Sequence, residues 1–338
     1  MKILSLITHF QHIDSWERST IRIDKELQSW NHLNRIQKAW FTAKIASKYD
    51  CIVFFFDPFI LVLYSGFYLL QHPKLKKPHT VFTTWLCDVS RFQKRSFTIM
   101  GFYDLLRWHF YRLFIKDCDK IVVHSSFERE LYSKTFKVLP EKFEFIHYCV
   151  RHDALVDGRI SEGGSKDEYV IAAGRHRDFA TFIEAMKDSN HYGVIICGES
   201  DLNSLSKPIP GNIKVYTEIP FSQYRSLIRQ AKALVIPLFK LKTLRSLGQV
   251  AAFEAIAQHV PVIASRSFQL QDYFSDKEIM YFEPEDFQEL QNQIDLLYTE
   301  ENLIKPLATR AYDLMMEKYT DQCYTDALLT ICGTFAKE

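Results

Sequence analysis

The feature that most constrains the fold is an alternation of short apolar runs with helical segments along the whole chain. The runs are KILSLI (2–7), CIVFFF (51–56), HTVFTTW (79–85), KIVVHS (120–125), YVIAAG (169–174), YGVIICG (192–198), IKVYT (213–217), ALVIPL (233–238) and VPVIAS (260–265). Continuous Val/Ile runs are typical of strands covered on both faces, as in a parallel sheet. Helical patterns at 179–187, 222–231 and 249–258 separate the later strands. The sequence therefore predicts an α/β protein with doubly wound sheets.

A polar stretch divides these strands into two groups. Residues 151–168, RHDALVDGRISEGGSKDE, contain no strand-like run, and each side holds enough strands for a sheet of its own. Residues 1–150 carry 22 Lys and Arg against 14 Asp and Glu, and residues 151–338 carry 20 against 27. A basic half and an acidic half indicate two domains with different partners. We predict domains at 1–152 and 153–310, followed by C-terminal helices at 311–338 that cross back to the first domain.

Membrane insertion and disulfide chemistry are not favoured. The apolar stretch 51–70 has the length of a membrane span, but Asp57-Pro58 and Gly66 interrupt it, so we expect a strand, a loop and a buried helix. MKILSLITHF is interpreted as a first strand and not as a signal peptide. The seven cysteines form no C-x-x-C pair, which indicates buried reduced thiols in a cytoplasmic protein and no structural zinc.

One carboxylate stands in an apolar helix. In RSLGQVAAFEAIAQHVPVIAS (245–265), Glu254 is surrounded by Ala, Phe and Ile. A charge in such a setting is costly unless it is paired. Glu254 is therefore expected either to reach a solvated cleft or to contact a polar group.

The residues before Glu254 predict an anion site. No Asp or Glu occurs from Ile219 to Phe253, although this segment holds six cations: Arg225, Arg229, Lys232, Lys240, Lys242 and Arg245. The first three have helical spacing and are consistent with a solvated face. The last three lie in the loop between ALVIPL and a helix that begins near Gly248. Such loops bind ligands in open α/β sheets, and helix starts attract anions, so we predict a phosphate or diphosphate there. The alternative is a surface loop with scattered lysines.

A second cationic turn follows the strand YVIAA. Gly174 ends the strand, and Arg175 and Arg177 come next. Arg175 is the better phosphate ligand because it follows the glycine directly and can bind bidentately. Arg177 could instead pair with Asp178 or stay solvated.

Four motifs in order resemble the GT-B glycosyltransferases, specifically glycosyltransferase family 4 and its relatives. They are DCDKIVVHSSFERELYSKTF with EKFEFIHYCVRHDAL, YVIAAGRHRDFATFIEAM, IKVYTEIPFSQYRSLIRQAKALVIPL and SLGQVAAFEAIAQHVPVIAS. The resemblance covers nearly the whole chain and is strongest after residue 117. It implies a GT-B fold, in which two Rossmann-like domains face each other across a cleft. It also implies that the second domain binds a nucleotide sugar.

The resemblance also assigns roles to residues of the second domain. It implies that Arg175, with Lys240 or Lys242, holds the diphosphate, and that Glu254 holds the ribose hydroxyls. The catalytic residues it implies are Arg175, Lys242 and Glu254. The donor-binding residues expected from the pattern and the resemblance are Gly174, Arg175, Arg177, Glu218, Ile219, Lys240, Lys242, Ser246, Leu247, Gly248, Gln249 and Glu254.

Three positions depart from the family pattern. Ser246 stands where the family usually has a glutamate that contacts the donor sugar, His259 replaces a glycine, and Trp85 stands where a histidine is common. The polar candidates left on the acceptor side are His9, Asp88 and His124, and the default for both histidines is a core or surface role. A neutral hydroxyl at position 246 predicts an unusual donor sugar or a slow enzyme.

The predicted reaction is transfer of a hexose from a UDP- or GDP-linked sugar, with no further cofactor. Because no D-x-D motif is present, fixed cations and a helix start are expected to stabilise the leaving diphosphate without metal, and the family resemblance implies retention. The expected acceptor is a glycan or a lipid-linked sugar. The alternatives are an inactive GT-B protein that binds a glycan or a protein partner, and a sugar-nucleotide epimerase, which would need acids that 219–253 lacks.

A segment rich in basic and aromatic residues indicates where in the cell the protein acts. Residues 91–116 carry six Lys and Arg, one acid and eight aromatic residues. This composition suits an anionic membrane surface or a lipid-linked acceptor, and the alternative is a core helix with a basic outer face. We expect a cytoplasmic protein, at the inner face of the cell membrane if 91–116 binds lipid. Nucleic acid is not expected, because no recognised binding motif accompanies the basic residues.

Overall fold

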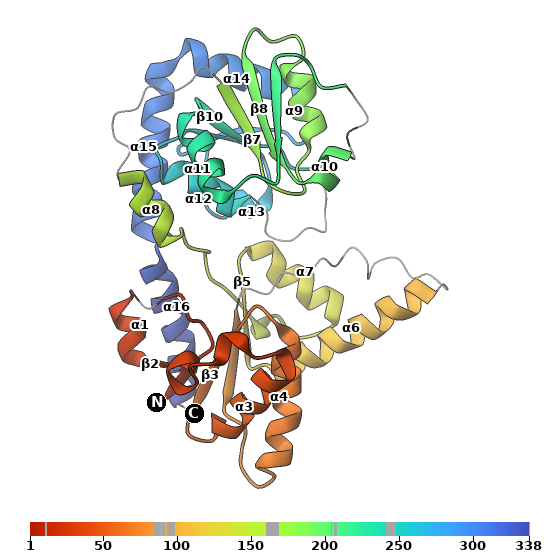
Figure 1. Cartoon of the computed structure of the whole chain (residues 1–338), viewed down its shortest axis with the longest axis vertical. Helices are drawn as coiled ribbons and strands as arrows, with labels where there is room; N and C mark the ends of the chain where they lie inside the picture. The colour runs from red at the N-terminus through yellow and green to blue at the C-terminus, as the bar shows by residue number, and fades with distance from the viewer. Residues whose placement is uncertain are drawn as a thin grey trace. The chain divides into compact units, whose positions relative to one another are not determined.

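In the computed structural model, the chain forms two compact units, each built on a parallel six-stranded sheet flanked by helices (Figure 1). The structure describes residues 1–10, 12–83, 89, 92, 99–159, 169–203, 205, 208–240 and 248–337. Among these, the first unit takes residues up to His147 and again from Asp321, and the second takes those from Tyr148 to Thr320. Two parallel sheets with flanking helices are the α/β architecture that the sequence predicts.

The first sheet has the order β2-β1-β3-β4-β5-β6. Its strands are β1 (Ile3–Ser5), β2 (Thr20–Arg22), β3 (Cys51–Phe55), β4 (His79–Thr83), β5 (Lys120–Val123) and β6 (Phe143–Phe145). Its helices are α1 (Asp14–Ser19), α2 (Ile23–Glu26), α3 (Arg35–Ala46), α4 (Pro58–Gln71), α6 (Ile99–Asp117), α7 (Ser126–Phe136) and α16 (Asp321–Thr334), with short 3-10 turns at Trp30–His32, Pro140–Lys142 and Phe335–Lys337. The sequence patterns predict four of these strands and miss the three-residue strands β2 and β6.

Alternate residues of the first sheet's strands pack against different helices. Ile52, Phe54 and Phe82 belong to a core with α3, α4, α6 and α7. On the opposite face, Cys51 and Thr83 contact the chain's last helix, α16, through Cys332 and Tyr324. The sheet is therefore covered on both sides, as its continuous apolar strands require.

The stretch 51–70 forms a strand, a turn and a helix, as predicted. Asp57 caps α4 by accepting a hydrogen bond from the Phe59 amide at 3.0 Å, and Pro58 occupies the first helical position. The helix is buried on one face only, because Phe59 is 46% exposed and Leu70 is 75% exposed. Within the described part of the chain, no helix is long and apolar enough to cross a membrane.

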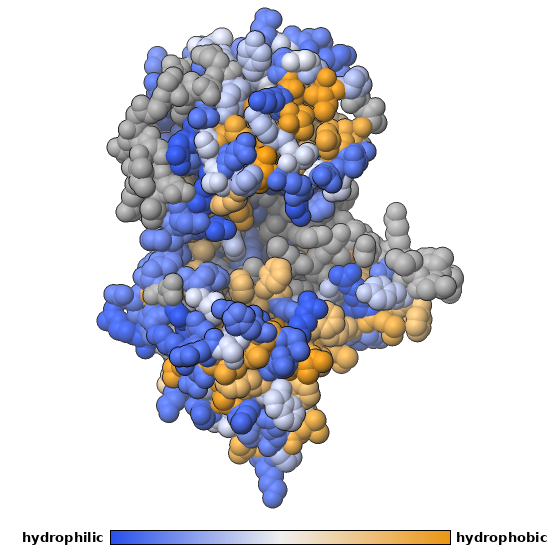
Figure 2. Space-filling model, viewed as in Figure 1, coloured by the Kyte–Doolittle hydropathy of each residue, from blue (hydrophilic) through white to orange (hydrophobic). Residues whose placement is uncertain are grey.

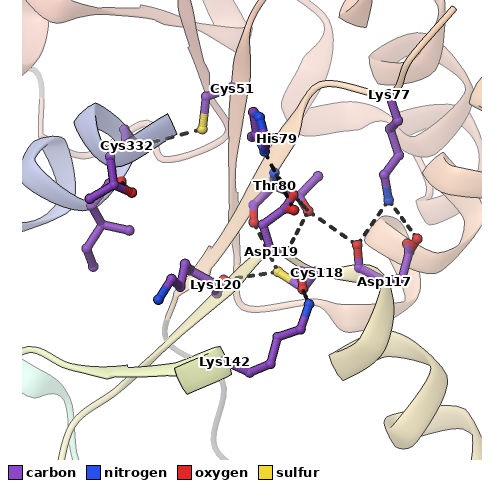
Figure 3. A network of polar contacts seen from close by, with 12 residues as sticks. Cys51, Lys77, His79, Thr80, Asp117, Cys118, Asp119, Lys120, Lys142 and Cys332 are labelled. Atoms are coloured by element: carbon purple, nitrogen blue, oxygen red, sulfur yellow. Dashed lines mark hydrogen bonds and ion pairs between the residues drawn. The ribbon is translucent and has the colours of Figure 1, made fainter. Parts of the chain in front are cut away.

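A polar network closes the amino-terminal edge of the first sheet (Figure 3). Lys77 donates to Asp117 at 2.6 Å, and Asp119 accepts from the Thr80 amide at 2.7 Å. The buried Cys118 thiol donates to the Thr80 carbonyl, and burial raises its pKa to about 12. These contacts join β4 to the end of α6 and the start of β5. Because ligands of parallel sheets bind at the carboxyl edge, we interpret this network as structural.

The second sheet has the order β12-β11-β10-β7-β8-β9. Its strands are β7 (Tyr169–Ala173), β8 (Tyr192–Cys197), β9 (Ile213–Thr217), β10 (Ala233–Ile236), β11 (Val262–Ser265) and β12 (Met280–Phe282). Its helices are α8 (His152–Arg159), α9 (Phe179–Met186), α10 (Glu199–Asn203), α11 (Phe221–Gln230), α12 (Gln249–Ile256), α13 (Phe268–Gln271), α14 (Phe287–Thr299) and α15 (Glu301–Lys318). The patterns predict five of the strands and miss β12.

Two apolar cores cover the two faces of the second sheet. Ile171, Leu234 and Val262 pack with residues of α11, α12 and α15. Val170, Val235 and Ile263 pack with residues of α9 and α14. Figure 1 shows the sheet between these two groups of helices. Because helices cover both faces of the sheet, a ligand can approach it at the loops that follow the carboxyl ends of the strands.

Candidate functional site

The strand order places the candidate donor site at the carboxyl edge of the second sheet, between β7 and β10. The chain runs from β7 to β8 and β9 on one side and returns to β10 on the other, so β7 and β10 form the topological switch point. Loops diverge at such a point and leave a crevice that binds ligands in open α/β sheets. The loop after β7 carries Gly174, Arg175 and Arg177, and the loop after β10 reaches Lys240. These segments hold the cations that the sequence analysis selects.

Gly174 and Arg177 fix the turn after β7. Gly174 has a φ of 122°, and its amide donates to the Ile196 carbonyl at 3.0 Å. A Cβ at this position would lie 2.9 Å from Nη2 of Arg177, so only glycine fits. Arg177 is buried and donates to the carbonyl oxygens of Ala173 and Arg175. Burial lowers the pKa of its guanidinium to about 10, so Arg177 stays charged at neutral pH and braces the turn from inside.

Asp178, the partner suggested for Arg177, has a different role. Its carboxylate caps α9 by accepting from the Thr181 amide at 3.2 Å and from the Thr181 hydroxyl at 2.6 Å. The cap fixes the start of the helix directly after the turn.

Arg175 is the exposed cation of this turn. Its side chain is 73% exposed, and its Nη2 lies 3.5 Å from Oε2 of Glu218, which follows β9. Ile219, the next donor candidate, is half-buried and packs on the core beneath. An exposed ion pair of this kind contributes little stability, so Arg175 can exchange Glu218 for an anionic ligand at small cost.

The start of α12 lies at the same edge. Gly248 precedes the helix with a φ of 102°, and a Cβ there would lie 3.3 Å from side-chain carbons of Ile236 and Leu270. Gln249 has a buried side chain that donates to the Gln269 carbonyl at 3.2 Å. Lys240 is exposed, and its amide donates to Glu285. The predicted site residues Lys242, Ser246, Leu247 and Asp88 lie outside the described residues.

Glu254 contacts an arginine inside the second unit. Arg225 donates through Nε to Oε2 of Glu254 at 2.8 Å and through Nη2 to Oε1 at 3.2 Å. The side chains are 7% and 2% exposed. Of the two expectations for this carboxylate, the structure shows the polar contact. It also corrects the interpretation of Arg225 as part of a solvated face, because Arg225 lies on the face of α11 that meets α12.

Further contacts extend the pair into a network. Arg225 also lies 3.1 Å from Oδ1 of Asp153, which receives hydrogen bonds from Arg151. Burial alone would raise the pKa of Asp153, but the hydrogen bonds from Arg151 and Arg225 lower it to about 2. One helical turn further on, Arg229 donates to Gln258 at 3.1 Å. The Arg225–Glu254 and Arg229–Gln258 contacts therefore join α11 to α12 and the turn after it. Sequence reasoning missed Asp153 because nothing in the pattern links it to residues more than 70 positions away.

The described acceptor-side candidates differ in accessibility. His9 is exposed after β1, and its ring centroid lies 5.2 Å from that of Phe55, at the end of β3. His124 is 3% exposed after β5, and its Nδ1 lies 3.1 Å from the Ile146 carbonyl. Burial lowers the pKa of His124 to about 4. His9 is thus accessible to solvent, whereas His124 is part of the core.

Comparison with solved structures shows the class of fold. Sucrose-phosphate synthase from Thermosynechococcus elongatus matches 96% of this chain and 83% of its own, with a TM-score of 0.64 and 16% identity. A glycosyltransferase from Rickettsia africae matches 100% and 90%, with 0.65 and 14%. HepE from Anabaena, solved in complex with UDP, matches 100% of both chains, with 0.66 and 12%. At these identities the likeness shows the fold alone, and it is the GT-B fold.

Part of the sequence matches a family model. Residues 161–314 match the family model described as glycosyl transferases group 1, which covers the second sheet and its switch point. This match to part of the chain, together with the GT-B fold, supports a glycosyltransferase. No curated protein matches it by sequence.

Loss of either partner of the Arg225–Glu254 pair should destabilise the second unit. Replacing either residue by an apolar one, Arg225→Met or Glu254→Leu, leaves a buried charge, so we expect each to lower the free energy of unfolding by about 3–5 kcal/mol. The double variant should lose less than the sum. Urea denaturation of the four proteins measures the coupling, with the exposed Lys214→Met as control. Strictly additive losses would show that the two side chains do not interact.

His124 should make the first unit sensitive to acid. The unfolded chain protonates this histidine below about pH 6.5, whereas the folded chain does so only near 4, so stability is intact above 6.5 and falls as the pH drops toward 4. The loss relative to a His124→Asn variant should reach roughly 3 kcal/mol. Unfolding curves measured across this pH range test it. His9→Asn should follow the wild type, and a parallel pH profile for His124→Asn would contradict the assignment.

Proposed function

We propose that this glycosyltransferase moves a sugar from a nucleoside-diphosphate sugar to a glycan or a lipid-linked acceptor, without a metal and with retention of configuration. The observation that carries the donor assignment is the exposed Arg175 directly after Gly174, at the switch point of the second sheet. Lys240 and the start of α12 lie on the neighbouring loop. Together they offer cations and backbone N–H groups to a diphosphate, whose negative charge grows as it leaves.

The nucleotide to test first is UDP. Structures with this fold include HepE from Anabaena in complex with UDP and in complex with UDP-glucose. We assign the diphosphate to Arg175 with Lys240 or Lys242 and the base to the segment Glu218–Pro220. A ribose can reach Glu254 only after the side chains that enclose its carboxylate move, because that side chain is 2% exposed. Arg175 is therefore the sharper residue on which to test the donor site.

The Arg175→Ala variant should separate diphosphate binding from nucleoside binding. Loss of a hydrogen bond to a charged group weakens binding by about 1.5–3 kcal/mol, so we expect UDP affinity to fall roughly 10- to 100-fold while uridine affinity changes little. Calorimetric titration with both ligands measures this. Lys187→Ala, at the opposite end of α9, is the matched control. Equal losses for UDP and uridine would refute the contact.

Turnover distinguishes an enzyme from a binding protein. A panel of UDP- and GDP-sugars should show release of nucleoside diphosphate with at least one donor, and the release should persist in EDTA if no metal takes part. Binding without release across many acceptors would favour the inactive alternative. An EDTA-sensitive rate would overturn metal independence, and the anomeric configuration of the product tests retention.

We also propose that the first unit contacts an anionic membrane through 91–116. In the described part of this segment, α6 exposes Phe102, Leu105, Leu106 and Leu113, and it carries Arg107, Arg112 and Lys116. Figure 2 shows hydrophobic residues on the part of α6 that extends from the first unit. Apolar groups beside cations suit the boundary between acyl chains and anionic headgroups.

The membrane contact should depend on both charge and apolar surface. The protein should sediment with phosphatidylcholine vesicles that contain phosphatidylserine, and less with pure phosphatidylcholine or in high salt. Leu105→Ser combined with Leu106→Ser should weaken this binding. Leu139→Ser, at an exposed position elsewhere on the first unit, should not. Sedimentation that does not depend on lipid charge would count against α6. So would an equal loss of binding in the Leu105/Leu106 double variant and in Leu139→Ser.

A further inference from the structure

The first unit contains a pocket at the carboxyl edge of its own sheet. Its volume is about 830 Å³, which is in the range of small-molecule sites. The strand order places the switch point between β1 and β3, and the segments that follow both strands line the pocket. Most of the lining is apolar, and its large side chains include Trp30, Leu33, Ile36, Phe56, Phe59 and Leu63.

Three of the six polar residues in the lining, Asn34, Arg35 and Asp57, form hydrogen bonds within the protein. Asn34 and Gln37 cap α3 reciprocally, and Asp57 accepts from the Phe59 amide and from Nε of Arg35 at 2.5 Å. A sugar presents many hydroxyl groups that need polar partners, and this lining has few to give. The chemistry therefore favours an apolar ligand over a bare glycan.

Phe56 adds an independent observation. It has a φ of 66°, and the Asp57 amide donates across it to the Phe55 carbonyl at 2.8 Å, which closes a three-residue turn. A bulky residue in this conformation costs about 1–3 kcal/mol, and such strain clusters at binding sites. The Phe56 side chain is nevertheless 65% exposed, so burial in the core does not repay the strain. A ligand that covers the Phe56 ring would bury this apolar surface and so offset the backbone strain.

Two cations lie among the lining residues. Lys38 holds its ammonium 5.3 Å from the Trp30 ring centroid, and the Arg35 side chain is 66% exposed. With Asp57 as the one acid in the lining, the mouth of the pocket has an excess of positive charge. An anionic group attached to an apolar chain would complement both features.

We propose that this pocket binds the apolar chain of a lipid-linked acceptor, with its phosphate near Lys38 and Arg35. The inference rests on the proposed function, which it deepens by naming the class of acceptor. Two contacts support the placement. His9, the exposed acceptor-side candidate, lies against Phe55 of the lining, and Phe59 stacks on Phe110 of α6 with centroids 4.4 Å apart. The pocket therefore adjoins both a polar candidate and the proposed membrane helix.

Calorimetric titration with farnesyl phosphate, below its micelle concentration, tests the pocket. The full chain should bind this probe, and Phe56→Asn combined with Ile36→Ser should weaken binding roughly 10-fold or more, because exposed apolar contact area is lost. Both side chains are largely exposed and Asn tolerates a positive φ, so the variant should fold. Leu70→Ser, on α4 but outside the lining, is the matched control. Lys38→Gln should weaken farnesyl phosphate binding but not farnesol binding.

The outcomes separate this inference from the proposed function. No binding of farnesyl phosphate, or an equal loss in Leu70→Ser, would overturn the pocket, because the second result indicates unspecific adsorption. UDP titration of the same samples reports on the second unit. UDP binding and sugar-donor turnover without farnesyl phosphate binding would sink the pocket alone. Specific farnesyl phosphate binding without any nucleotide binding would sink the proposed function and leave the pocket as a lipid site.

Discussion

The pairing of β7 with β10 is the constraint on which the candidate donor site depends. These strands are distant in the chain, but their register, Ala233 with Val170 and Val235 with Ala172, brings both carboxyl ends to one edge of the sheet. The turn at Gly174 and the loop that reaches Lys240 then lie on neighbouring strands. Parallel hydrogen bonding, and not any contact between the cations, thus brings Arg175 and Lys240 to one edge. The apolar cores on both faces fix the register, since a shift by one residue would reverse every side chain.

The buried pair of Arg225 and Glu254 gives a predicted site residue a structural role. Two hydrogen bonds join the side chains, and Asp153 contributes a third carboxylate oxygen to the same guanidinium. Such a pair stabilises the fold less than an apolar pair would, but losing one partner is expensive. It fixes α12 against α11, and α12 begins at the ligand edge. Glu254 therefore positions the helix start, whatever it contributes to a ribose.

The first unit is also built on a doubly wound parallel sheet, but its strand order differs and so does the chemistry at its open edge. Its switch point is lined by aromatic and aliphatic side chains, with a strained Phe56 at the strand end. The second unit's edge has glycines and cations at the corresponding strand ends. Two doubly wound sheets thus present an apolar pocket in one unit and the proposed anion site in the other. The side chains at a few loop positions explain this contrast. The net charge of each half of the sequence does not, because the basic half has the apolar pocket and the acidic half has the cationic loops.

Much of the fold follows from the sequence by itself, because a strand buried on both faces must be a continuous apolar run. Nine strands, the helices at 179–187, 222–231 and 249–258, and the cationic turns at Gly174 and Lys240 are visible in this way. The strands β2, β6 and β12 are not, because each has only three residues; β1 is equally short but lies in the longer apolar run KILSLI. Only the tertiary structure decided that Arg225 turns inward to Glu254, that Arg177 is buried while Arg175 is exposed, and that Phe56 faces a pocket. Each of these depends on which chain segments pack together over long separations, and local sequence carries no record of that.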